Sequence, residues 1–316
     1  MPRILFVKTS SLGDVVHNLP AVSDAARCVP DAAIDWVVEE AFAELPALHP
    51  AVARVIPVAI RRWRRALARP RTWTEVAAFA RALRAGRYDH VVDTQGLLKS
   101  ALLARLARGA HHGFDRGSAR EPIAARLYDT GHAVPGALHA VERNRRLAAA
   151  ALGYRADGAC EYGLRATGEP PLATTQPYAV LLTMTSRAGK LWPEAHWRAL
   201  AATLGARGLA LVLPSGSEEE RARCERIAGP FPGAICPPRM GISALARLLS
   251  GARFVVGVDT GLAHLAAALG VPTIGIFCGS DPVRTGLYGA PRARNLGAPG
   301  APPEPSQVLA ALEAIS

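Results

Sequence analysis

The sequence predicts an α/β protein made of two domains, each with a parallel sheet. Short apolar runs alternate with helical patterns along the whole chain, which is typical of βαβ units. Two similar strand-to-helix turns, at Asp14 and Asp259, stand near opposite ends of the chain. Residues 158–177 between them are rich in Gly, Pro and Thr, which favours a linker. We therefore expect domains at residues 1–157 and 178–316 whose loop ends face one central cleft.

The first half carries four predicted strands with helices between them. Ile4–Val7 is a short apolar run followed by small residues, the pattern of a buried parallel strand. Pro20 falls inside the first helical pattern, so its first turns should be irregular. The expected strands are Ile4–Val7, Ile34–Val38, Val55–Ile60 and His90–Asp93, and the expected helices are Val15–Cys28, Thr74–Ala85 and Leu97–Ala107.

The second half repeats this alternation. Gly270 ends one helical pattern as a C-cap. A Pro-rich break at Ala298–Pro305 precedes a short helical tail, Ser306–Ile315, which could pack back on the first domain. The expected strands are Tyr178–Leu182, Ala210–Pro214, Phe254–Val258 and Thr273–Phe277, and the expected helices are Glu194–Ala206, Glu218–Ala228, Ile242–Ser250 and Leu262–Leu269.

The charge of the chain is concentrated in its first half. Of the formal net charge of +11 on 316 residues, residues 1–160 carry +8 and residues 161–316 carry +3. This excess predicts an anionic partner, either a nucleic acid, a membrane surface or a phosphorylated substrate. The five cysteines are scattered without metal-ligand spacing, which favours a reducing cytoplasm and predicts no metal site. No apolar run reaches about 18 residues, so we expect no membrane span.

Asp14 and Asp259 are the first candidates for chemistry. Each follows a strand and stands where a helix begins, so each could cap its helix or serve a reaction, and the residues alone leave both open. His264 stands in the first turn of its helix and should face the crevice above the sheet. His17 lies one turn after Asp14, and we expect it to pack inside the domain.

Three further polar segments follow predicted strands. The run Arg61-Arg62-Trp63-Arg64-Arg65 could grip phosphate or carboxylate groups, form a solvated loop or bind nucleic acid. Thr183–Lys190 has the composition of a phosphate-holding loop without the P-loop order, and Lys190 could equally be a solvated surface residue. The acidic turn Glu218–Glu220 suits the dipole of its helix, and one of its carboxylates could accept ribose hydroxyls.

Taken together, these segments resemble the ADP-heptose-dependent heptosyltransferases of lipopolysaccharide synthesis, which have the GT-B fold of two Rossmann-like domains. The string Asp259-Thr260-Gly261-Leu262-x-His264 marks the broad group, and Ile60-Arg61-Arg62-Trp63-Arg64 points to the first heptosyltransferase of that group. The other matching strings are Val7 to Asp14, Asp35 to Glu40, Arg54 to Arg65, Asp93 to Leu97, Ala119 to Pro122 and Lys190 to Trp197.

The resemblance implies a role for each candidate residue. Asp14 would be the catalytic base and Lys190 would stabilise the leaving phosphate. The donor would be held by Thr185, Ser186 and Lys190 at its pyrophosphate, Glu220 at the ribose, Met240 near the adenine, Asp259 at the heptose hydroxyls, and Thr260, Gly261 and His264 at the phosphates. The anionic acceptor would be received by Arg61, Arg62, Arg64, Arg65 and Arg120. Two departures from the family pattern are Ser215, where a Trp often stands, and the less acidic pair Ala188-Gly189.

The resemblance also implies the reaction and its partners. ADP-heptose is the donor substrate, Kdo-modified lipid A is the acceptor, and no cofactor or metal takes part. The protein would act peripherally at the cytoplasmic face of the inner membrane, without nucleic acid. The alternatives are heptosyltransferase II or another sugar transferase of this fold, and a non-enzymatic nucleotide- or nucleic-acid-binding protein, which would leave Asp14 unexplained.

Overall fold

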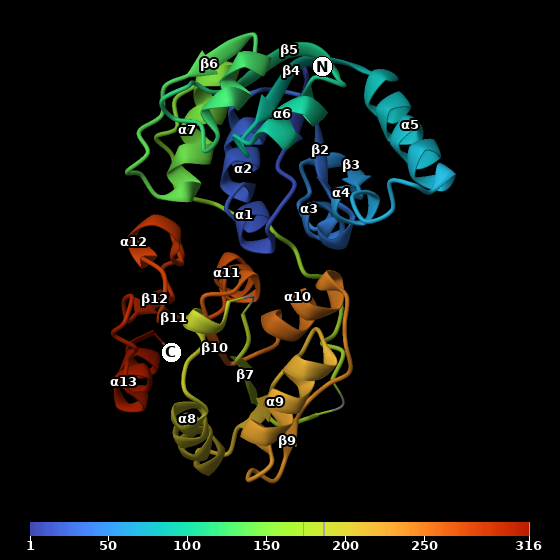
Figure 1. The fold of residues 1–316 in the computed structure, drawn as a ribbon. Helices are drawn as coiled ribbons and strands as arrows, with labels where there is room; N and C mark the ends of the chain where they lie inside the picture. The colour runs from blue at the N-terminus through green and yellow to red at the C-terminus, as the bar shows by residue number, and fades with distance from the viewer. Residues whose placement is uncertain (173, 186, 316) are drawn as a thin grey trace. The chain divides into compact units, whose positions relative to one another are not determined.

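The chain forms two compact α/β units in the computed structural model, which describes residues 1–172, 174–185 and 187–315 (Figure 1). The first unit covers Met1–Leu164 and the second begins at Arg165. The division between the units therefore falls inside residues 158–177. No helix in the described ranges is long and apolar enough to cross a bilayer.

The first unit is built on a parallel sheet of six strands. The strand order is β3-β2-β1-β4-β5-β6, the arrangement of a Rossmann-type sheet. Val7 at the end of β1 pairs with Val37 on one side and Asp93 on the other, so the carboxyl ends of the central strands meet at one edge. The strands are β1 (Arg3–Val7), β2 (Ala33–Glu39), β3 (Val52–Val58), β4 (Arg87–Asp93), β5 (Arg108–Phe114) and β6 (Thr130–His132).

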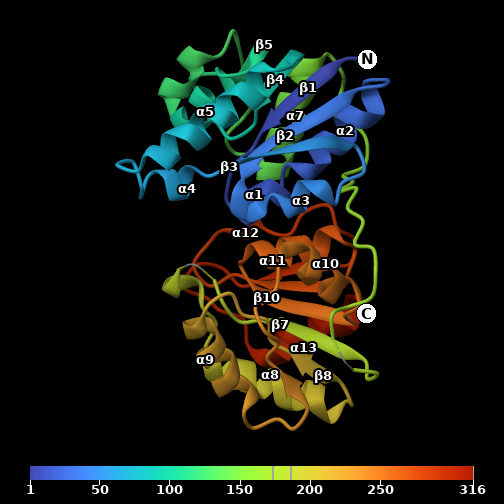
Figure 2. The same ribbon diagram turned by 90° about the vertical axis from the view of Figure 1, so that its right-hand side faces the viewer.

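Helices cover both faces of this sheet. On one face, α5 and α6 share a hydrophobic cluster with the strands, in which Phe79 and Leu83 of α5 join Ala104 at the end of α6. On the other face α2 packs on α7 (Figure 2). A buried ion pair joins the two helices, with Arg145 Nε 2.7 Å from Asp24 Oδ2. The helices are α1 (Leu12–Val16), α2 (Leu19–Cys28), α3 (Glu44–Ala47), α4 (Ile60–Trp63), α5 (Pro70–Arg84), α6 (Leu98–Ala104) and α7 (Ala140–Leu152), with 3₁₀ turns η1 (Glu40–Phe42) and η2 (Pro122–Leu127).

The second unit has the same strand topology as the first. Its order is β12-β11-β10-β7-β8-β9, again all parallel. The predicted α/β fold of two Rossmann-like domains is confirmed. The strands are β7 (Tyr178–Leu182), β8 (Ala210–Val212), β9 (Ala234–Ile235), β10 (Phe254–Val258), β11 (Thr273–Ile276) and β12 (Ala293–Leu296), and the helices are η3 (Ala188–Lys190), α8 (Glu194–Ala206), α9 (Glu218–Ala228), α10 (Ile242–Ser250), α11 (Gly261–Ala268), α12 (Pro282–Thr285) and α13 (Pro305–Ile315).

The core of the second unit is centred on two tryptophans. The rings of Trp192 and Trp197 are fully buried and meet edge to face, with centroids 5.0 Å apart. Val308 and Leu312 of α13 belong to the same cluster. We expected that this last helix could pack back on the first domain. In the structure, the apolar face of this helix is buried in the core of the second unit.

Several predicted boundaries differ from the structure. The helix predicted at Val15–Cys28 is two helices, because the chain turns at His17 and Asn18 and Pro20 takes the first turn of α2. The strand predicted to reach Ile60 ends at Val58, and Ile60 opens α4. Strands β5, β6, β9 and β12 and helix α7 were not predicted. The apolar runs of β5 and β6 are interrupted by His and Gly, and β9 and β12 have only two and four residues.

Buried histidines should make the first unit sensitive to acid. Burial lowers the pKa of His49 to about 4, and burial together with His90 and His132 lowers the pKa of His112 to about 4. Between pH 6.5 and 4 the unfolded chain therefore binds more protons than the folded chain, so stability falls as the pH falls through this window. His49 alone should cost about 2 kcal/mol at pH 5.

Thermal melts between pH 7 and 5 measure this effect. We expect the melting temperature of the wild type to fall, and that of His49→Gln to fall less over the same range. Equal slopes for the two proteins would show that His49 does not carry the effect.

Candidate active site

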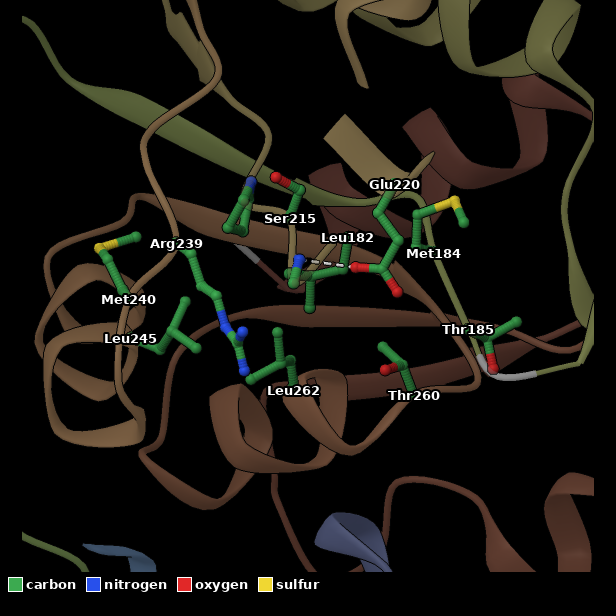
Figure 3. A pocket seen from close by; sticks show the side chains of 12 residues that line it. Leu182, Met184, Thr185, Ser215, Glu220, Arg239, Met240, Leu245, Thr260 and Leu262 are labelled. Carbon is green, nitrogen blue, oxygen red and sulfur yellow. Dashed lines mark hydrogen bonds between the residues drawn. The ribbon is translucent and has the colours of Figure 1, made fainter. Parts of the chain in front are cut away.

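A pocket opens at the carboxyl ends of the strands of the second unit. Its volume is about 310 Å³. The loops after β7, β8 and β9 and the start of α11 supply its walls (Figure 3). It is lined by Leu182, Met184, Thr185, Pro214, Ser215, Gly216, Glu220, Arg239, Met240, Leu245, Thr260 and Leu262. This is the place where open α/β sheets bind ligands.

The polarity of the pocket changes along its length. Met240 and Leu245 lie at one end, and the hydroxyls of Thr185 and Thr260 lie at the other (Figure 3). Glu220 stands between the two ends, and its Oε2 accepts a hydrogen bond of 2.6 Å from the Gly216 N–H. An elongated ligand with an apolar ring, hydroxyls in the middle and an anionic end fits this order of groups.

Asp259 is the centre of a charged cluster next to Thr185. Lys190 Nζ lies 2.5 Å from Asp259 Oδ2, and Ser280 donates a hydrogen bond to the same oxygen. His264 Nε2 lies 3.6 Å from the other oxygen, Oδ1. Burial opposes the charge of Asp259, but hydrogen bonds from His264, Lys190 and Ser280 outweigh burial and hold the pKa of its carboxyl well below the usual range. Asp259 is therefore a carboxylate at neutral pH.

The local chain path explains this cluster. Asp259 follows the last residue of β10, and its N–H continues the sheet ladder to the Ile276 carbonyl at 3.0 Å. Thr260 has an extended backbone and occupies the N-cap position of α11, so the chain turns directly after Asp259. A Cβ at Gly279 would collide with the Gly189 carbonyl oxygen. Glycine at 279 thus permits the close approach that brings the loop carrying Ser280 next to Lys190.

The first unit places Asp14 in the opening turn of α1. Its Oδ2 accepts hydrogen bonds from the Ser11 N–H at 2.6 Å and the Ser11 hydroxyl at 3.1 Å, which makes a capping box. The helix-cap interpretation of Asp14 is therefore correct, and it leaves Oδ1 without a hydrogen bond in the described part of the chain. Asp14 is half-buried, so this oxygen is available to a ligand.

A buried network holds the loop beneath Asp14. Gln95 Oε1 accepts hydrogen bonds from the N–H groups of Thr9 at 3.0 Å and Ser10 at 3.3 Å, and Asp93 Oδ1 accepts one from the Gln95 N–H at 2.8 Å. Lys8 Nζ donates to the Thr94 carbonyl at 2.7 Å. Burial lowers the pKa of Lys8, while the carboxylates of Asp14 and Asp93 act in the opposite direction. No role was predicted for Lys8 from the sequence. The feature that could have indicated one is a lysine directly after an apolar strand.

The five predicted acceptor arginines do not share one environment. Arg62 is engaged on both sides, 2.6 Å from Glu75 Oε2 and 3.0 Å from Glu40 Oε2. The guanidinium of Arg61 stacks over the Phe42 ring, with 5.3 Å to its centroid. The side chains of Arg64, Arg65 and Arg120 are exposed and have no hydrogen bond or ion pair within the described residues. We conclude that Arg62 is committed to structure, whereas the last three are available to an anion.

The predicted donor residues fall into two groups in the second unit. Thr185, Glu220, Met240 and Thr260 line the pocket. Lys190, Asp259 and His264 form the charged cluster, which Thr185 joins because its hydroxyl donates to the Asp259 carbonyl at 2.8 Å. Gly261 opens α11, and Ser186 lies outside the described residues.

The structure adds two residues that were not predicted from the sequence, Arg239 in the pocket and Ser280 in the cluster around Asp259. Arg239 reaches into the pocket between Leu245 and Leu262 (Figure 3). Ser280 belongs to the loop after β11. Arg239 follows β9, which pairs with β8, and Ser280 follows β11, which pairs with β10. These positions could have indicated both residues, because the carboxyl ends of neighbouring parallel strands meet at one edge of a sheet. In the described ranges no group of three His, Cys, Asp or Glu side chains is arranged to hold a metal ion.

Comparison with known proteins agrees with this description. The family model described as glycosyltransferase family 9 (heptosyltransferase) matches residues 76–310. The chain is 50% identical to lipopolysaccharide heptosyltransferase 1 of Pseudomonas aeruginosa over 289 residues, 91% of this chain and 81% of that protein. It is 47% identical to lipopolysaccharide heptosyltransferase 1 of Escherichia coli K12 over 290 residues, 91% of each chain.

The fold is also similar to solved structures. The Escherichia coli heptosyltransferase WaaC with ADP superposes with a TM-score of 0.93 at 44% identity, covering 99% of this chain and 100% of that chain. WaaC with ADP-2-deoxy-2-fluoro heptose superposes with a TM-score of 0.87 at 45% identity, covering 99% and 98%.

Fold, pocket and comparisons together define a glycosyltransferase with two Rossmann-like domains, as the GT-B enzymes have. The chain belongs to glycosyltransferase family 9, the heptosyltransferase family. The resemblance seen in the sequence is confirmed.

Proposed function

We propose that this enzyme transfers a heptose from ADP-heptose to a Kdo sugar of Kdo-modified lipid A, by a metal-independent displacement with inversion. The observation that carries the proposal is the donor pocket, whose threonine end adjoins the Lys190–Asp259 cluster. The similarity to heptosyltransferase 1 proteins, and to a structure determined with an ADP-heptose analogue, supports this choice of donor. The donor is consumed in the reaction, so no separate cofactor is proposed.

The donor fits the pocket in one direction. The adenine packs against Met240, the ribose hydroxyls donate to Glu220, and the diphosphate lies at Thr185 and Thr260. At that end Lys190 and the free N–H groups that open α11 meet the negative charge. This direction brings the heptose towards Asp259, whose carboxylate accepts hydrogen bonds from sugar hydroxyls.

The reaction is a single displacement at the anomeric carbon. A hydroxyl of the acceptor Kdo attacks while Asp14 removes its proton, and the bond to the ADP oxygen breaks on the opposite face. Charge grows on the leaving phosphate, and Lys190 stabilises it as it leaves. Because the attack comes from the face opposite the leaving group, the anomeric configuration inverts.

The ion pair between Lys190 and Asp259 has a role before the donor arrives. It holds the lysine beside the pocket and neutralises the charge of a buried carboxylate, since the side chains of Lys190 and Asp259 are 20% and 9% exposed. When the diphosphate binds, Lys190 can contact the phosphate while His264 and Ser280 keep Asp259 ionised. The cluster therefore serves the phosphate and the sugar together.

The acceptor is received by the arginines of the first unit. Lipid A phosphates and Kdo carboxylates are anions that guanidinium groups bind with two hydrogen bonds. Arg64, Arg65 and Arg120 are available for this, and Arg61 contributes from its stacked position on Phe42. We place the enzyme peripherally at the cytoplasmic face of the inner membrane, where such a lipid acceptor is presented, and we propose no nucleic-acid partner.

Arg64 and Arg65 provide a test of the acceptor assignment. Replacing both with Gln should raise the apparent KM for the acceptor by about tenfold, because each exposed guanidinium supplies a charge-assisted contact, and should leave ADP affinity unchanged. The matched control is Arg62→Gln, which should lower the melting temperature by a few degrees with a smaller change in acceptor KM. Loss of ADP affinity with a normal acceptor KM would reassign the first unit to the donor.

The function itself is tested by incubating the enzyme with ADP-heptose and Kdo-modified lipid A. ADP release that requires both substrates, and a product heavier by one heptose, are the expected results. ADP release with an acceptor that already carries the first heptose, and none with Kdo-modified lipid A, would favour heptosyltransferase II activity. Salt-sensitive binding of nucleic acid without any transfer would overturn the proposal in favour of a binding protein.

A further inference from the structure

Exposed apolar side chains gather in one part of the first unit. Within the described residues, seven large apolar side chains are exposed. Met1 and Val283 stand apart in the sequence. The other five belong to α5, α6, η2 and the loop before α5, and they are Leu67, Trp73, Leu98, Leu102 and Ile123. Exposed apolar side chains on neighbouring elements are typical of an interaction surface.

These elements form one layer on one face of the sheet. α5 packs over β3, α6 packs over β4 and β1, and η2 packs against α6 and β5. α5 and α6 lie over the sheet face opposite to that of α2, as the two ribbon views show (Figures 1 and 2). The α2–α7 layer exposes no large apolar side chain in the described ranges. We call the outer surface of α5, of the loop before it, of α6 and of η2 the α5–α6 face.

Trp73 and Leu67 form the first apolar patch of this face. Trp73 is 58% exposed and Leu67 is 55% exposed. The indole N–H donates to the Leu67 carbonyl at 2.9 Å, so its polar group is already satisfied and its ring is left to the surroundings. A tryptophan with a satisfied N–H and an exposed ring suits the boundary between water and hydrocarbon.

Leu98, Leu102 and Ile123 form the second apolar patch. Leu98 and Leu102 stand four residues apart on α6, and therefore lie on the same side of that helix. They are 37% and 52% exposed, and Ile123 on the adjoining η2 is 46% exposed. Exposed cations stand between and beside these residues in the chain, namely Lys99, Arg120 and Arg126.

The chain around the first patch is strongly basic. Between residues 60 and 84, Glu75 is the only acidic residue, and Arg62 and Arg71 already bind it. Arg64, Arg65 and Arg69 are exposed and form no side-chain hydrogen bond or ion pair in the described part of the chain. The basic residues of this segment are Arg61, Arg62, Arg64, Arg65, Arg69, Arg71, Arg81 and Arg84.

We propose that the α5–α6 face docks on a bilayer that contains anionic phospholipid. Leu67, Trp73, Leu98, Leu102 and Ile123 enter the boundary between headgroups and acyl chains, and the arginines around them bind lipid phosphates. A second copy of this chain fits less well, because a symmetric contact would bring the same excess positive charge together. The docking proposal rests on the proposed function in one respect, which is that the proposed acceptor is a lipid held in the membrane.

Vesicle binding tests the proposal on the full-length protein. The wild type should sediment with vesicles of phosphatidylglycerol and phosphatidylethanolamine and far less with vesicles of phosphatidylcholine alone. The double variants Leu67→Ser/Trp73→Ser and Leu98→Ser/Leu102→Ser should each lower the partition coefficient at least about tenfold. The matched control is Val283→Ser, which removes a side chain that is 74% exposed in the second unit and should change nothing. Thermal melts check that each variant is folded.

Two results would overturn the docking proposal. One is a wild type that does not bind the anionic vesicles, and the other is an equal loss of binding in Val283→Ser. Sedimentation velocity gives a third such result. If the wild type is a dimer that does not bind vesicles, and the patch variants are monomers, the face would be assigned to a second copy of the chain.

Transfer to a water-soluble Kdo fragment without acyl chains separates this proposal from the proposed function. The four patch residues take no part in the chemistry, so both double variants should keep the wild-type rate on that fragment. Vesicle binding without any heptose transfer would contradict the proposed function and leave the docking surface intact. Normal heptose transfer without vesicle binding would contradict the docking surface and leave the proposed function intact.

Discussion

Asp14→Asn should lower turnover by at least about 10²-fold while ADP affinity and the fold are retained. The carboxylate is held in the opening turn of α1, where Oδ2 accepts hydrogen bonds from Ser11 and Oδ1 accepts none from the described residues. An asparagine can still accept the hydrogen bond from the Ser11 N–H, so the cap survives. What the variant loses is the ability to take a proton from the acceptor hydroxyl.

The matched control for Asp14→Asn is Ser11→Ala. It removes the hydroxyl that donates to Asp14 at 3.1 Å but keeps the carboxylate and the backbone hydrogen bond. We expect it to turn over within about fivefold of the wild type. Steady-state rates with saturating acceptor, together with calorimetric titration of ADP, separate chemistry from binding. If Asp14→Asn also turned over within about threefold of the wild type, another residue would be the base.

Lys190→Ala should weaken ADP binding by about tenfold and lower kcat by about 10²-fold or more. The effect on kcat is larger because the phosphate gains charge as the anomeric bond breaks. The variant also removes the cation 2.5 Å from Asp259, leaving that buried carboxylate to Ser280 and His264. A double-mutant cycle with Asp259→Asn measures the coupling between the two side chains.

Arg187→Ala is the matched control for Lys190→Ala. Arg187 is an exposed cation three residues earlier in the same loop, and its side chain has no hydrogen bond or ion pair among the described residues. Calorimetry with ADP should show a change of less than about threefold for this variant. Equal losses in the two variants would mean that the net charge of the loop, and not the position of Lys190, attracts the donor.

The sequence predicted the second unit well because its strands are strongly apolar. β7 and β10 were predicted with their observed bounds, since both are fully buried and both end in a turn with polar residues. The first unit was harder to predict. β5 contains two histidines and two glycines, and its strand character comes from pairing with β4 and β6.

The candidate site was predictable to the extent that strand ends can be recognised. Asp14, Lys190, Glu220 and Asp259 all follow or adjoin predicted strands, and parallel strands bring such positions to one edge. The resemblance to known heptosyltransferases then gave each residue a role. Arg239 and Ser280 were not predicted. Arg239 follows β9, a strand of only two residues, and Ser280 follows β11, whose sequence gives no sign of a site in the next loop.

The sequence by itself determined the α/β class, the two domains, the basic first half and the family, because these depend on local pattern and residue identity. Only the tertiary structure decided how the polar residues are partnered. Within the described residues it paired Lys190 with Asp259, bound Arg62 between Glu40 and Glu75, left Arg64 and Arg65 without an ion pair, and exposed five apolar side chains on the α5–α6 face. These contacts join residues far apart in the chain, so their geometry follows from packing and not from any local signal.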